Sequence, residues 1–369
     1  MTLITHLGID IEISRGDFSL RANFSTNHGL TAFYGRSGTG KTTLANAIAG
    51  LEKPNFGKIV LGTRTLYNSD KNVIISPEKR RIGYIFQDGR LFPHLSVQKN
   101  LLYGRRCIPS DIEFPDFDEI INLLDLQDLL YRHPINLSGG EKQRVAFGRA
   151  ILSAPELLIM DEPLAALDPG HKDEIFPFIQ RLRDNIGVPI IYISHALEEI
   201  IRLADYMVIF DKGITVASGP VDRIMSQLNL RTLIGHHEAG AVLQATICGQ
   251  DKTFGLTELN FKRGRLFVAG IDLPLGTSVR VRIRASNVSL SLTKPSDTSI
   301  LNVLPAKVIE ITENFEPQMD VLLDIGIPLI ARITRRSLTN MKLQPGTAVF
   351  ALIKSTAIDR RSLGLVDID

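Results

Sequence analysis

This 369-residue sequence has few cysteines and no dominant charge. Its two cysteines, Cys107 and Cys248, lie far apart and form no CxxC pair. We therefore expect reduced thiols rather than a disulfide framework. The 42 Lys and Arg residues nearly balance the 40 Asp and Glu residues, leaving a net charge of +2. The basic residues are spread along the chain, which argues against the concentrated basic surface of a nucleic-acid-binding protein.

Long apolar runs are also missing. No segment approaches the ~20 apolar residues that span a bilayer. Residues 1–10 lack the basic head and apolar core of a signal peptide. We expect a cytosolic chain that reaches a membrane only by docking to another protein.

The first 235 residues alternate short apolar runs with helix-like periods, which is typical of an α/β sheet with crossover helices. Four predicted strands end at a polar residue or glycine: Leu30–Tyr34, Ile82–Phe86, Leu157–Met160 and Pro189–Ile193. Open parallel sheets bind ligands beyond the carboxyl ends of their strands. We expect these four ends to meet in one crevice.

Helical periodicity predicts helices at Ala196–Ala204 and Asp118–Leu130. The second lies in a segment without an obvious strand, about residues 88–137, which we interpret as a helical insert. This gives a first domain over residues 1–235.

The pattern changes after Gly235. Short β-type runs separated by glycine and proline follow one another, which predicts a small all-β barrel. Residues 236–295 are interpreted as a linker, beginning with residues 236–240, and a first β segment. Residues 296–365 form a second β segment. The alternating arginines Arg280, Arg282 and Arg284 are predicted to lie on a solvated sheet face.

Residues Gly35–Thr42 match GxxxxGK[ST] between a predicted strand and a helix, the context that a phosphate-binding loop requires. Backbone N–H groups and Lys41 would hold the phosphates, and the Thr42 hydroxyl would ligate Mg²⁺. The predicted nucleotide-binding residues of this region are Gly35, Arg36, Ser37, Gly38, Thr39, Gly40, Lys41, Thr42 and Thr43.

Two adjacent acids, Asp161 and Glu162, end a buried strand, where carboxylates are costly unless they have a role. Asp161 is predicted to hold Mg²⁺ and Glu162 to activate the attacking water. His195 ends another strand and is predicted to contact the γ-phosphate or the water. Gln87 is predicted to sense the metal or water and to move the insert.

A second phosphate cradle without a lysine lies at Leu137–Arg144. Ser138 is a natural helix N-cap, and Gly139 and Gly140 expose N–H groups at the positive end of the next helix. One nucleotide does not need two cradles from one subunit. We therefore expect a head-to-tail homodimer in which each ATP lies between the first loop of one copy and the second loop of the other.

Together these motifs resemble the ATP-binding subunits of ABC transporters over residues 1–235. The resemblance implies a P-loop α/β fold with a helical subdomain, ATP and Mg²⁺ as ligands, and a D-loop at Ala166–Asp168 that adds Asp168 to the nucleotide site. The segment Leu91–Val97 resembles importer ATPases, whose insert receives a helix of the membrane permease. The family usually stacks adenine on an aromatic residue near the first strands, where Phe18 is the nearest aromatic and Arg15 an alternative.

The segment Thr298–Val308 resembles the opening of a molybdate-binding Mop domain, an OB-like barrel, and two later segments match as well. The resemblance implies oxyanion candidates, which are Ser299, Thr334, Ser337, Lys354 and Ser355. It also implies molybdate as a regulatory ligand that holds the ATPases apart. The alternative is that these side chains are ordinary polar groups of a structural tail.

The whole chain is therefore similar to ATPase subunits of molybdate importers. This implies a peripheral protein on the cytoplasmic face of the inner membrane, with integral permease subunits and, through the complex, a periplasmic molybdate-binding protein as partners. Import of tungstate, sulfate or ferric ion is one alternative. A soluble ABC-type ATPase without a transport role and an oxyanion storage or sensor protein are the others.

Overall fold

The computed structural model describes residues 6–27, 29–109, 112–165, 167–235, 240–271, 273–312, 318–358 and 364–365. The predicted D-loop residue Ala166 and most of the predicted linker, residues 236–239, lie outside the described residues. The chain divides into two compact units. The cassette unit comprises Met1–Ala196 and Leu203–Ser218, and the tail unit comprises Leu197–Arg202 and Gly219–Asp369.

The cassette unit contains the larger sheet, in which the described residues form eleven strands in the order β6-β5-β4-β1-β2-β11-β10-β3-β9-β8-β7. Its parallel strands are β3 (Leu30–Tyr34), β7 (Ile82–Ile85), β8 (Leu157–Asp161), β9 (Ile190–Ile193) and β10 (Tyr206–Asp211). Every residue of β3, β8 and β9 is buried, as expected for parallel strands that are covered on both faces. The four predicted strands are neighbours and run parallel, so the prediction that their carboxyl ends share one edge is confirmed.

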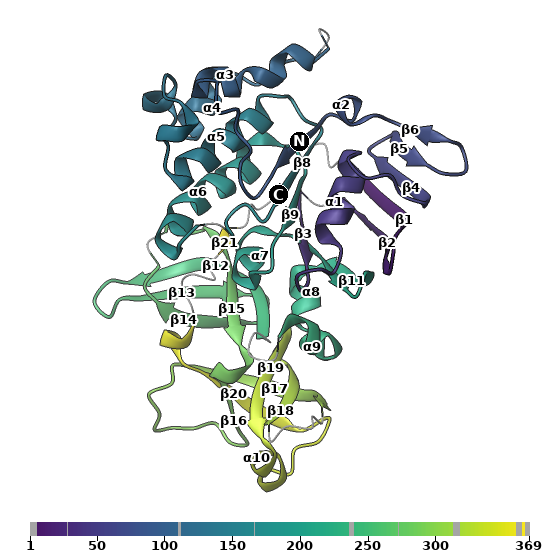
Figure 1. Ribbon diagram of the computed structural model, residues 1–369. Coiled ribbons are helices and arrows are strands. Elements are labelled where there is room, and N and C mark those ends of the chain that lie inside the picture. The colour runs from purple at the N-terminus through teal and green to yellow at the C-terminus, as the bar shows by residue number, and fades with distance from the viewer. Residues whose placement is uncertain are drawn as a thin grey trace. The chain divides into compact units, whose positions relative to one another are not determined.

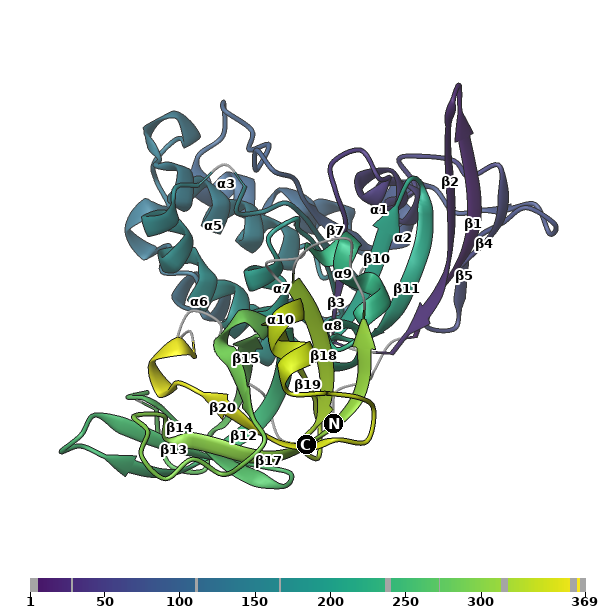
Figure 2. The ribbon, with the colours of Figure 1, turned by 90° about the horizontal axis from the view of Figure 1, so that it is seen from below.

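An antiparallel extension of this sheet was not predicted. It consists of β1 (Leu7–Arg15), β2 (Phe18–Thr26), β4 (Phe56–Leu61), β5 (Arg64–Asn68) and β6 (Val73–Ile74), while β11 (Ile214–Pro220) joins it to the parallel part. Figure 2 shows β1, β2, β4 and β5 as long neighbouring strands. The extension carries Phe18, the first residue of β2, to the phosphate-binding loop.

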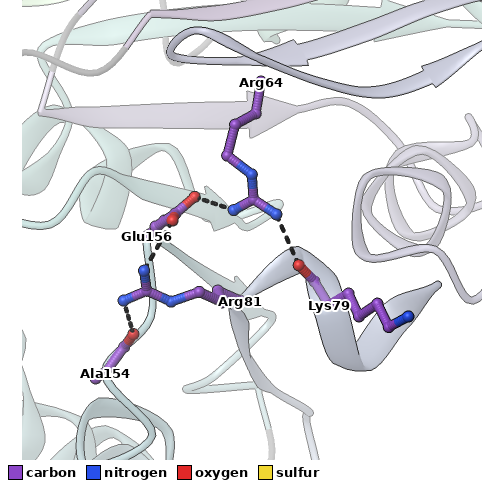
Figure 3. Close-up of polar contacts among 5 residues, drawn as sticks. All are labelled: Arg64, Lys79, Arg81, Ala154 and Glu156. Atoms are coloured by element: carbon purple, nitrogen blue, oxygen red, sulfur yellow. Dashed lines mark hydrogen bonds and ion pairs between the residues drawn. The ribbon is translucent and has the colours of Figure 1, made fainter. Parts of the chain in front are cut away.

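An ion-pair cluster fastens this extension to the parallel strands. Figure 3 shows Glu156, which immediately precedes β8, between the guanidinium groups of Arg64 in β5 and Arg81. Arg64 also donates to the Lys79 carbonyl at 2.7 Å in α2 (Pro77–Arg80), and Arg81 donates to the Ala154 carbonyl at 2.8 Å. All three charged side chains are partly buried. The cluster joins segments that are distant in the sequence, since Arg64, Arg81 and Glu156 come from separate elements.

The helices of the cassette unit include α1 (Lys41–Ala49), α3 (Val97–Leu101), α4 (Phe117–Leu123), α5 (Gly139–Ile151) and α6 (Pro169–Ile186). Figure 1 shows α3 to α6 gathered into one blue and teal helical region. No strand occurs in the described residues between 88 and 137, where 3₁₀ turns lie at Tyr103–Cys107, Gln127–Leu129 and Pro134–Asn136. The predicted helix Asp118–Leu130 was too long, because Asp125 adopts a left-handed φ of 48° that interrupts it.

The tail unit contains two five-stranded sheets, in the orders β14-β13-β12-β15-β21 and β16-β20-β17-β18-β19. The first comprises β12 (Gly240–Asp251), β13 (Leu256–Phe261), β14 (Gly264–Ala269), β15 (Ser278–Arg284) and β21 (Gly364–Leu365). The second comprises β16 (Val288–Ser291), β17 (Asn302–Thr312), β18 (Gln318–Asp324), β19 (Pro328–Thr334) and β20 (Ala348–Ile353). One apolar cluster draws on both sheets, so the tail unit has a common core.

Short helices complete the tail unit: α8 (Val221–Met225), α9 (Arg231–Ile234), α10 (Arg335–Asn340) and 3₁₀ turns at Leu228–Leu230, Ala285–Asn287 and Ser355–Ala357. Helix α7 (Leu197–Leu203) is divided, since its first six residues group with the tail unit and Leu203 with the cassette unit.

The prediction of a solvated arginine face on β15 was wrong. Arg280 and Arg282 are only 4% and 1% exposed. Strict alternation separates the two faces of a strand, but it does not show whether water or another element covers the polar face. Here α7 covers it, as the hydrogen bonds described below show.

Candidate nucleotide site

The phosphate-binding loop connects β3 to α1, and two of its glycines are required by close contacts. A Cβ atom at Gly35 would lie 2.4 Å from the Phe210 carbonyl oxygen. Gly40, the N-cap of α1, has a φ of 99°, which side-chain-bearing residues rarely adopt. The loop is therefore held in a tight turn, with Gly35 against Phe210 of β10.

Lys41 is buried at the start of α1 and its ammonium group donates to the carbonyls of Gly35 and Arg36, both at 2.8 Å. Burial lowers the pKa of Lys41 from its ordinary value, while the nearby charges of Glu162 and Asp161 act to raise it. The side chain closes the loop on itself and presents a positive charge to the cleft.

A cleft of about 310 Å³ opens over this loop. It is lined by Phe18, Ser37, Gly38, Gly40, Lys41, Thr42, Thr43 and Glu162. A Cβ atom at Gly40 would lie 3.0 Å from the Phe18 ring, so this ring rests against the loop. The structure thus brings the nearest aromatic residue of the sequence to the predicted phosphate site.

Two oxygen groups that suit a magnesium ion lie beside the cleft. The Thr42 hydroxyl donates to Asp161 Oδ1 at 3.2 Å, and the Tyr84 hydroxyl donates to Asp161 Oδ2 at 3.1 Å. Burial raises the pKa of Asp161, although these two hydrogen bonds act in the opposite direction. A hydroxyl and one carboxylate next to a phosphate loop fit Mg²⁺, which proteins usually bind through one or two carboxylates together with substrate phosphates.

Tyr84 was missed by the sequence reasoning. Burial, followed by the charge of Asp161, raises the pKa of Tyr84, so its phenol remains a hydrogen-bond donor. The sequence did contain a signal for this role, because Tyr84 places a hydroxyl group inside the otherwise apolar predicted strand Ile82–Phe86. Gln87 was predicted to sense the metal or water. It is exposed, two residues beyond the end of β7, and it is not among the described hydrogen-bond partners of Asp161.

Glu162 and His195 are brought together from two adjacent strands. Glu162 Oε1 lies 3.4 Å from His195 Nδ1, and the Glu162 amide donates to the Ile193 carbonyl at 3.0 Å. Glu162 has a φ of 47°, an uncommon left-handed conformation that costs free energy and is concentrated at functional sites. The carboxylate lines the cleft and the imidazole is exposed beside it.

The second phosphate cradle is a capped helix end. The Ser138 hydroxyl accepts the Glu141 amide and the Glu141 carboxylate accepts the Ser138 amide at 2.7 Å, which is a complete capping box at the start of α5. Ser138 and Gly139 are exposed, and a Cβ atom at Gly139 would lie 3.2 Å from the Leu167 side chain. The cradle therefore lies beside the predicted D-loop.

Asp168 is the N-cap of α6 and accepts the amides of Gly170 and His171, each at 3.1 Å. Its other oxygen lies 2.6 Å from His171 Nδ1, which lowers the pKa of Asp168 and raises that of His171. Ser138, Gly139, Gly140 and Asp168 are not among the described residues that line the cleft. The two predicted phosphate-binding segments of one copy therefore do not share this cleft.

The oxyanion candidates of the tail unit are only partly brought together. Thr334 and Ser337 share a hydrogen bond of 2.9 Å and line a cleft of about 490 Å³ together with Arg332 and Gln318. Ser355 is buried and accepts a hydrogen bond of 3.3 Å from Asn302. Ser299 and Lys354 are exposed and do not line this cleft.

Two features are absent from the described residues, a membrane-spanning helix and a cluster of metal-ligating side chains. None of their helices combines the length and apolar character needed to cross a membrane. They also contain no group of three or more His, Cys, Asp or Glu residues arranged to hold a metal ion.

Two family models match this chain. The ABC transporter family model matches residues 21–165 and the TOBE domain model matches residues 298–359. An ATP-binding cassette of an ABC transporter, solved in its ADP conformation, aligns with a TM-score of 0.52 at 25% identity over 63% of this chain and 96% of its own. The cassette cbiO1 of the Clostridium perfringens cbiONQ transporter complex aligns with a TM-score of 0.51 at 24% identity, over 63% of this chain and 96% of its own. This similarity supports the fold alone.

The sequence comparison extends over both units. The molybdenum import ATP-binding protein ModC of Paramagnetospirillum magneticum is 44% identical over 98% of this chain and 100% of its own length. ModC of Rhodospirillum rubrum is 44% identical over 97% of this chain and 98% of its own length. Similarity at this level along the entire length, together with the two family matches, shows that this chain belongs to the molybdenum import ATP-binding proteins of ABC transporters.

Proposed function

We propose that this chain hydrolyses ATP to power molybdate import and that Glu162 is the general base of the reaction. The observation that carries the proposal is the position of Glu162, which lines the phosphate-loop cleft 3.4 Å from His195. A carboxylate at the end of β8 can accept a proton from water beside the γ-phosphate. His195 orients this carboxylate and contacts the phosphate.

The phosphates bind to the N–H groups of Gly35–Thr43, and Lys41 turns from its two loop carbonyls to the β- and γ-phosphates. Thr42 and Asp161 hold Mg²⁺, which supplies positive charge to the phosphate oxygens. Tyr84 keeps the Asp161 carboxylate in place. Phe18, at the wall of the cleft, provides an apolar face for the adenine.

The complete site requires a second copy of the chain. Ser138, Gly139, Gly140 and Asp168 lie outside the cleft of their own copy, so they bind the γ-phosphate that the partner's loop holds. Each charge-assisted hydrogen bond of this kind contributes about 1.5–3 kcal/mol. Loss of the γ-phosphate removes these bonds and opens the dimer, and Gln87 passes this change to the helical insert.

The partners follow from the family. An ATP-binding subunit of an importer works with membrane permease subunits. We place the chain at the cytoplasmic face of the inner membrane, with a periplasmic molybdate-binding protein delivering the oxyanion. Tungstate, which has the same charge and shape, is the alternative cargo.

The decisive measurement is ATP hydrolysis by the chain reconstituted with its permease and the binding protein in vesicles. We expect molybdate delivered on the binding-protein side to stimulate hydrolysis and to accumulate on the opposite side, whereas sulfate does neither. Hydrolysis that is indifferent to every oxyanion would contradict the proposed transport function. Equal stimulation by tungstate would broaden the cargo.

The cleft at Thr334 and Ser337 is the proposed regulatory oxyanion site. Its hydroxyls and the Gln318 amide are donor types that bind tetrahedral anions, and the Arg332 guanidinium beside them is paired with the Asp320 carboxylate at 2.8 and 2.9 Å. Equilibrium dialysis of the full chain with molybdate tests it, with a Thr334→Val, Ser337→Ala variant as the control. Absence of binding up to millimolar molybdate would leave a purely structural tail.

A further inference from the structure

Three arginines of the tail unit occupy one face of β15. Arg280, Arg282 and Arg284 alternate with Val279, Val281 and Ile283, which belong to the apolar core of the tail unit. Side chains two residues apart on a strand share a face. The three guanidinium groups therefore leave β15 on the side opposite to its core.

All three arginines contact the first six residues of α7. Arg284 donates to the Glu198 carboxylate at 2.7 Å, and an Arg282 nitrogen lies 3.9 Å from the same oxygen. Arg280 donates to the Ile201 carbonyl at 3.1 Å. The Arg282 side chain is fully buried and Arg280 nearly so, whereas the Arg284 and Glu198 side chains are 35% and 46% exposed.

The position of α7 in the chain gives these contacts their importance. The helix begins two residues after His195. Its last residue, Leu203, belongs to the cassette unit, and the Leu203 carbonyl accepts a hydrogen bond of 3.3 Å from Arg183. A displacement of β15 that preserves these hydrogen bonds would move Glu198 and Ile201 with it. The backbone between His195 and Leu197 is one of the places where the chain passes from one unit to the other.

We infer that Arg284 is a positioning residue for ATP hydrolysis, which acts through Glu198 and α7 on the placement of His195 against Glu162. Arg280 assists from the other end of the helix. This inference rests on the proposed role of His195. The 3.4 Å separation of Glu162 and His195 exceeds an ordinary hydrogen bond, so a small shift of the histidine strengthens or breaks the contact. The tail unit can thereby set the rate of hydrolysis through a covalent connection that is two peptide bonds long.

Charge reversal tests the inference on the full-length chain. The variants Arg284→Glu, Glu198→Arg and the double variant are compared by kcat and KM for ATP. A partly exposed ion pair contributes up to about 1 kcal/mol, so we expect each single reversal to lower kcat about fivefold at unchanged KM. The double variant should be faster than Glu198→Arg alone because the pair is restored with opposite polarity, and it should stay slower than the wild type because the buried Arg282 still lies beside position 198. Arg284→Lys should also retain most of the rate.

A matched control is the ion pair between Arg265, which is exposed, and Glu258, which is partly buried, in the same unit; the two atoms lie 2.8 Å apart and α7 is not involved. Arg265→Glu should keep the wild-type kcat. The inference is overturned if both single reversals keep the wild-type kcat, if the double variant is as slow as the slower single variant, or if Arg265→Glu loses as much activity. Glu162→Gln is measured in parallel. If it retained activity, the proposed catalytic base would be wrong, whereas its loss of activity alongside fully active Arg284→Glu would reject only the positioning role.

Discussion

Glu162 Oε1 and His195 Nδ1 lie 3.4 Å apart, although 32 positions separate the residues in the sequence numbering. The parallel pairing of β8 with β9 brings the two strand ends side by side. The proposed base, Glu162, therefore lies beside His195, which precedes α7 by two residues. The first prediction concerns this base.

Replacement of Glu162 by Gln should leave ATP bound but reduce turnover by roughly 10²–10⁴-fold, because the amide cannot accept the proton of the attacking water. Steady-state phosphate release and nucleotide binding by filter assay measure the two effects separately. Hydrolysis at the wild-type rate would show that another group is the base.

Two substitutions at Ser138 should separate helix capping from phosphate binding. Ser138→Ala removes the cap of α5 and should destabilise the cassette unit by about 1 kcal/mol. Ser138→Asp retains the cap, but its negative charge would repel the γ-phosphate of the partner copy. We expect Ser138→Asp to unfold like the wild type in urea while failing to dimerise with ATP in sedimentation experiments. ATP-dependent dimers of the Asp variant would contradict the shared site.

The His171–Asp168 pair predicts a specific pH dependence at the N-terminus of α6. The pKa of His171 is raised from 6.5, so its contribution to stability is complete below pH 6.5 and is lost as the pH rises through the raised pKa. The pKa of Asp168 is lowered from 3.8, so its contribution is complete above pH 3.8 and is lost as the pH falls through the lowered pKa. NMR titration of His171 should show the raised pKa, and Asp168→Asn should return it toward 6.5. A titration that Asp168→Asn leaves unchanged would exclude the pair as the cause.

The cluster around Glu156 should stabilise the cassette unit. Glu156→Gln removes the charge that two partly buried arginines share, and we expect a loss of about 1–2 kcal/mol in the free energy of unfolding. Urea titration followed by circular dichroism measures it. Glu258→Gln should change the value by less than about 0.5 kcal/mol, because Glu258 has a single arginine partner, Arg265, whose side chain is 70% exposed. Equal effects of the two variants would mean that the cluster has no special role in joining β5 to β8.

Phe18 should affect nucleotide affinity without affecting chemistry. Phe18→Ala removes the ring that lies against Gly40, and we expect KM for ATP to rise about tenfold with kcat little changed. Phe18→Tyr keeps the ring and should behave like the wild type. A selective loss of kcat would instead place Phe18 in the support of the phosphate loop.

Much of the candidate site could be predicted because its residues are local. Gly35–Thr42 and Ser138–Glu141 contain their own turn and capping residues, so a few neighbouring positions determine the backbone. The strands that precede Asp161 and His195 are apolar throughout, which identified them as buried. The length of α4 was mispredicted because the left-handed residue Asp125 is compatible with helical periodicity on either side of it.

The sequence by itself determined the phosphate loop, the acidic strand end, the second cradle and the change to a β-rich tail, because hydrophobic period, glycine placement and helix caps act over a few residues. Only the tertiary structure decided that Tyr84 supports Asp161, that Phe18 reaches the loop, and that the arginines of β15 are buried against α7. Those contacts join residues from separate elements. Their formation depends on which strands pair and which face a helix covers, and neither is encoded in the alternation of a single segment.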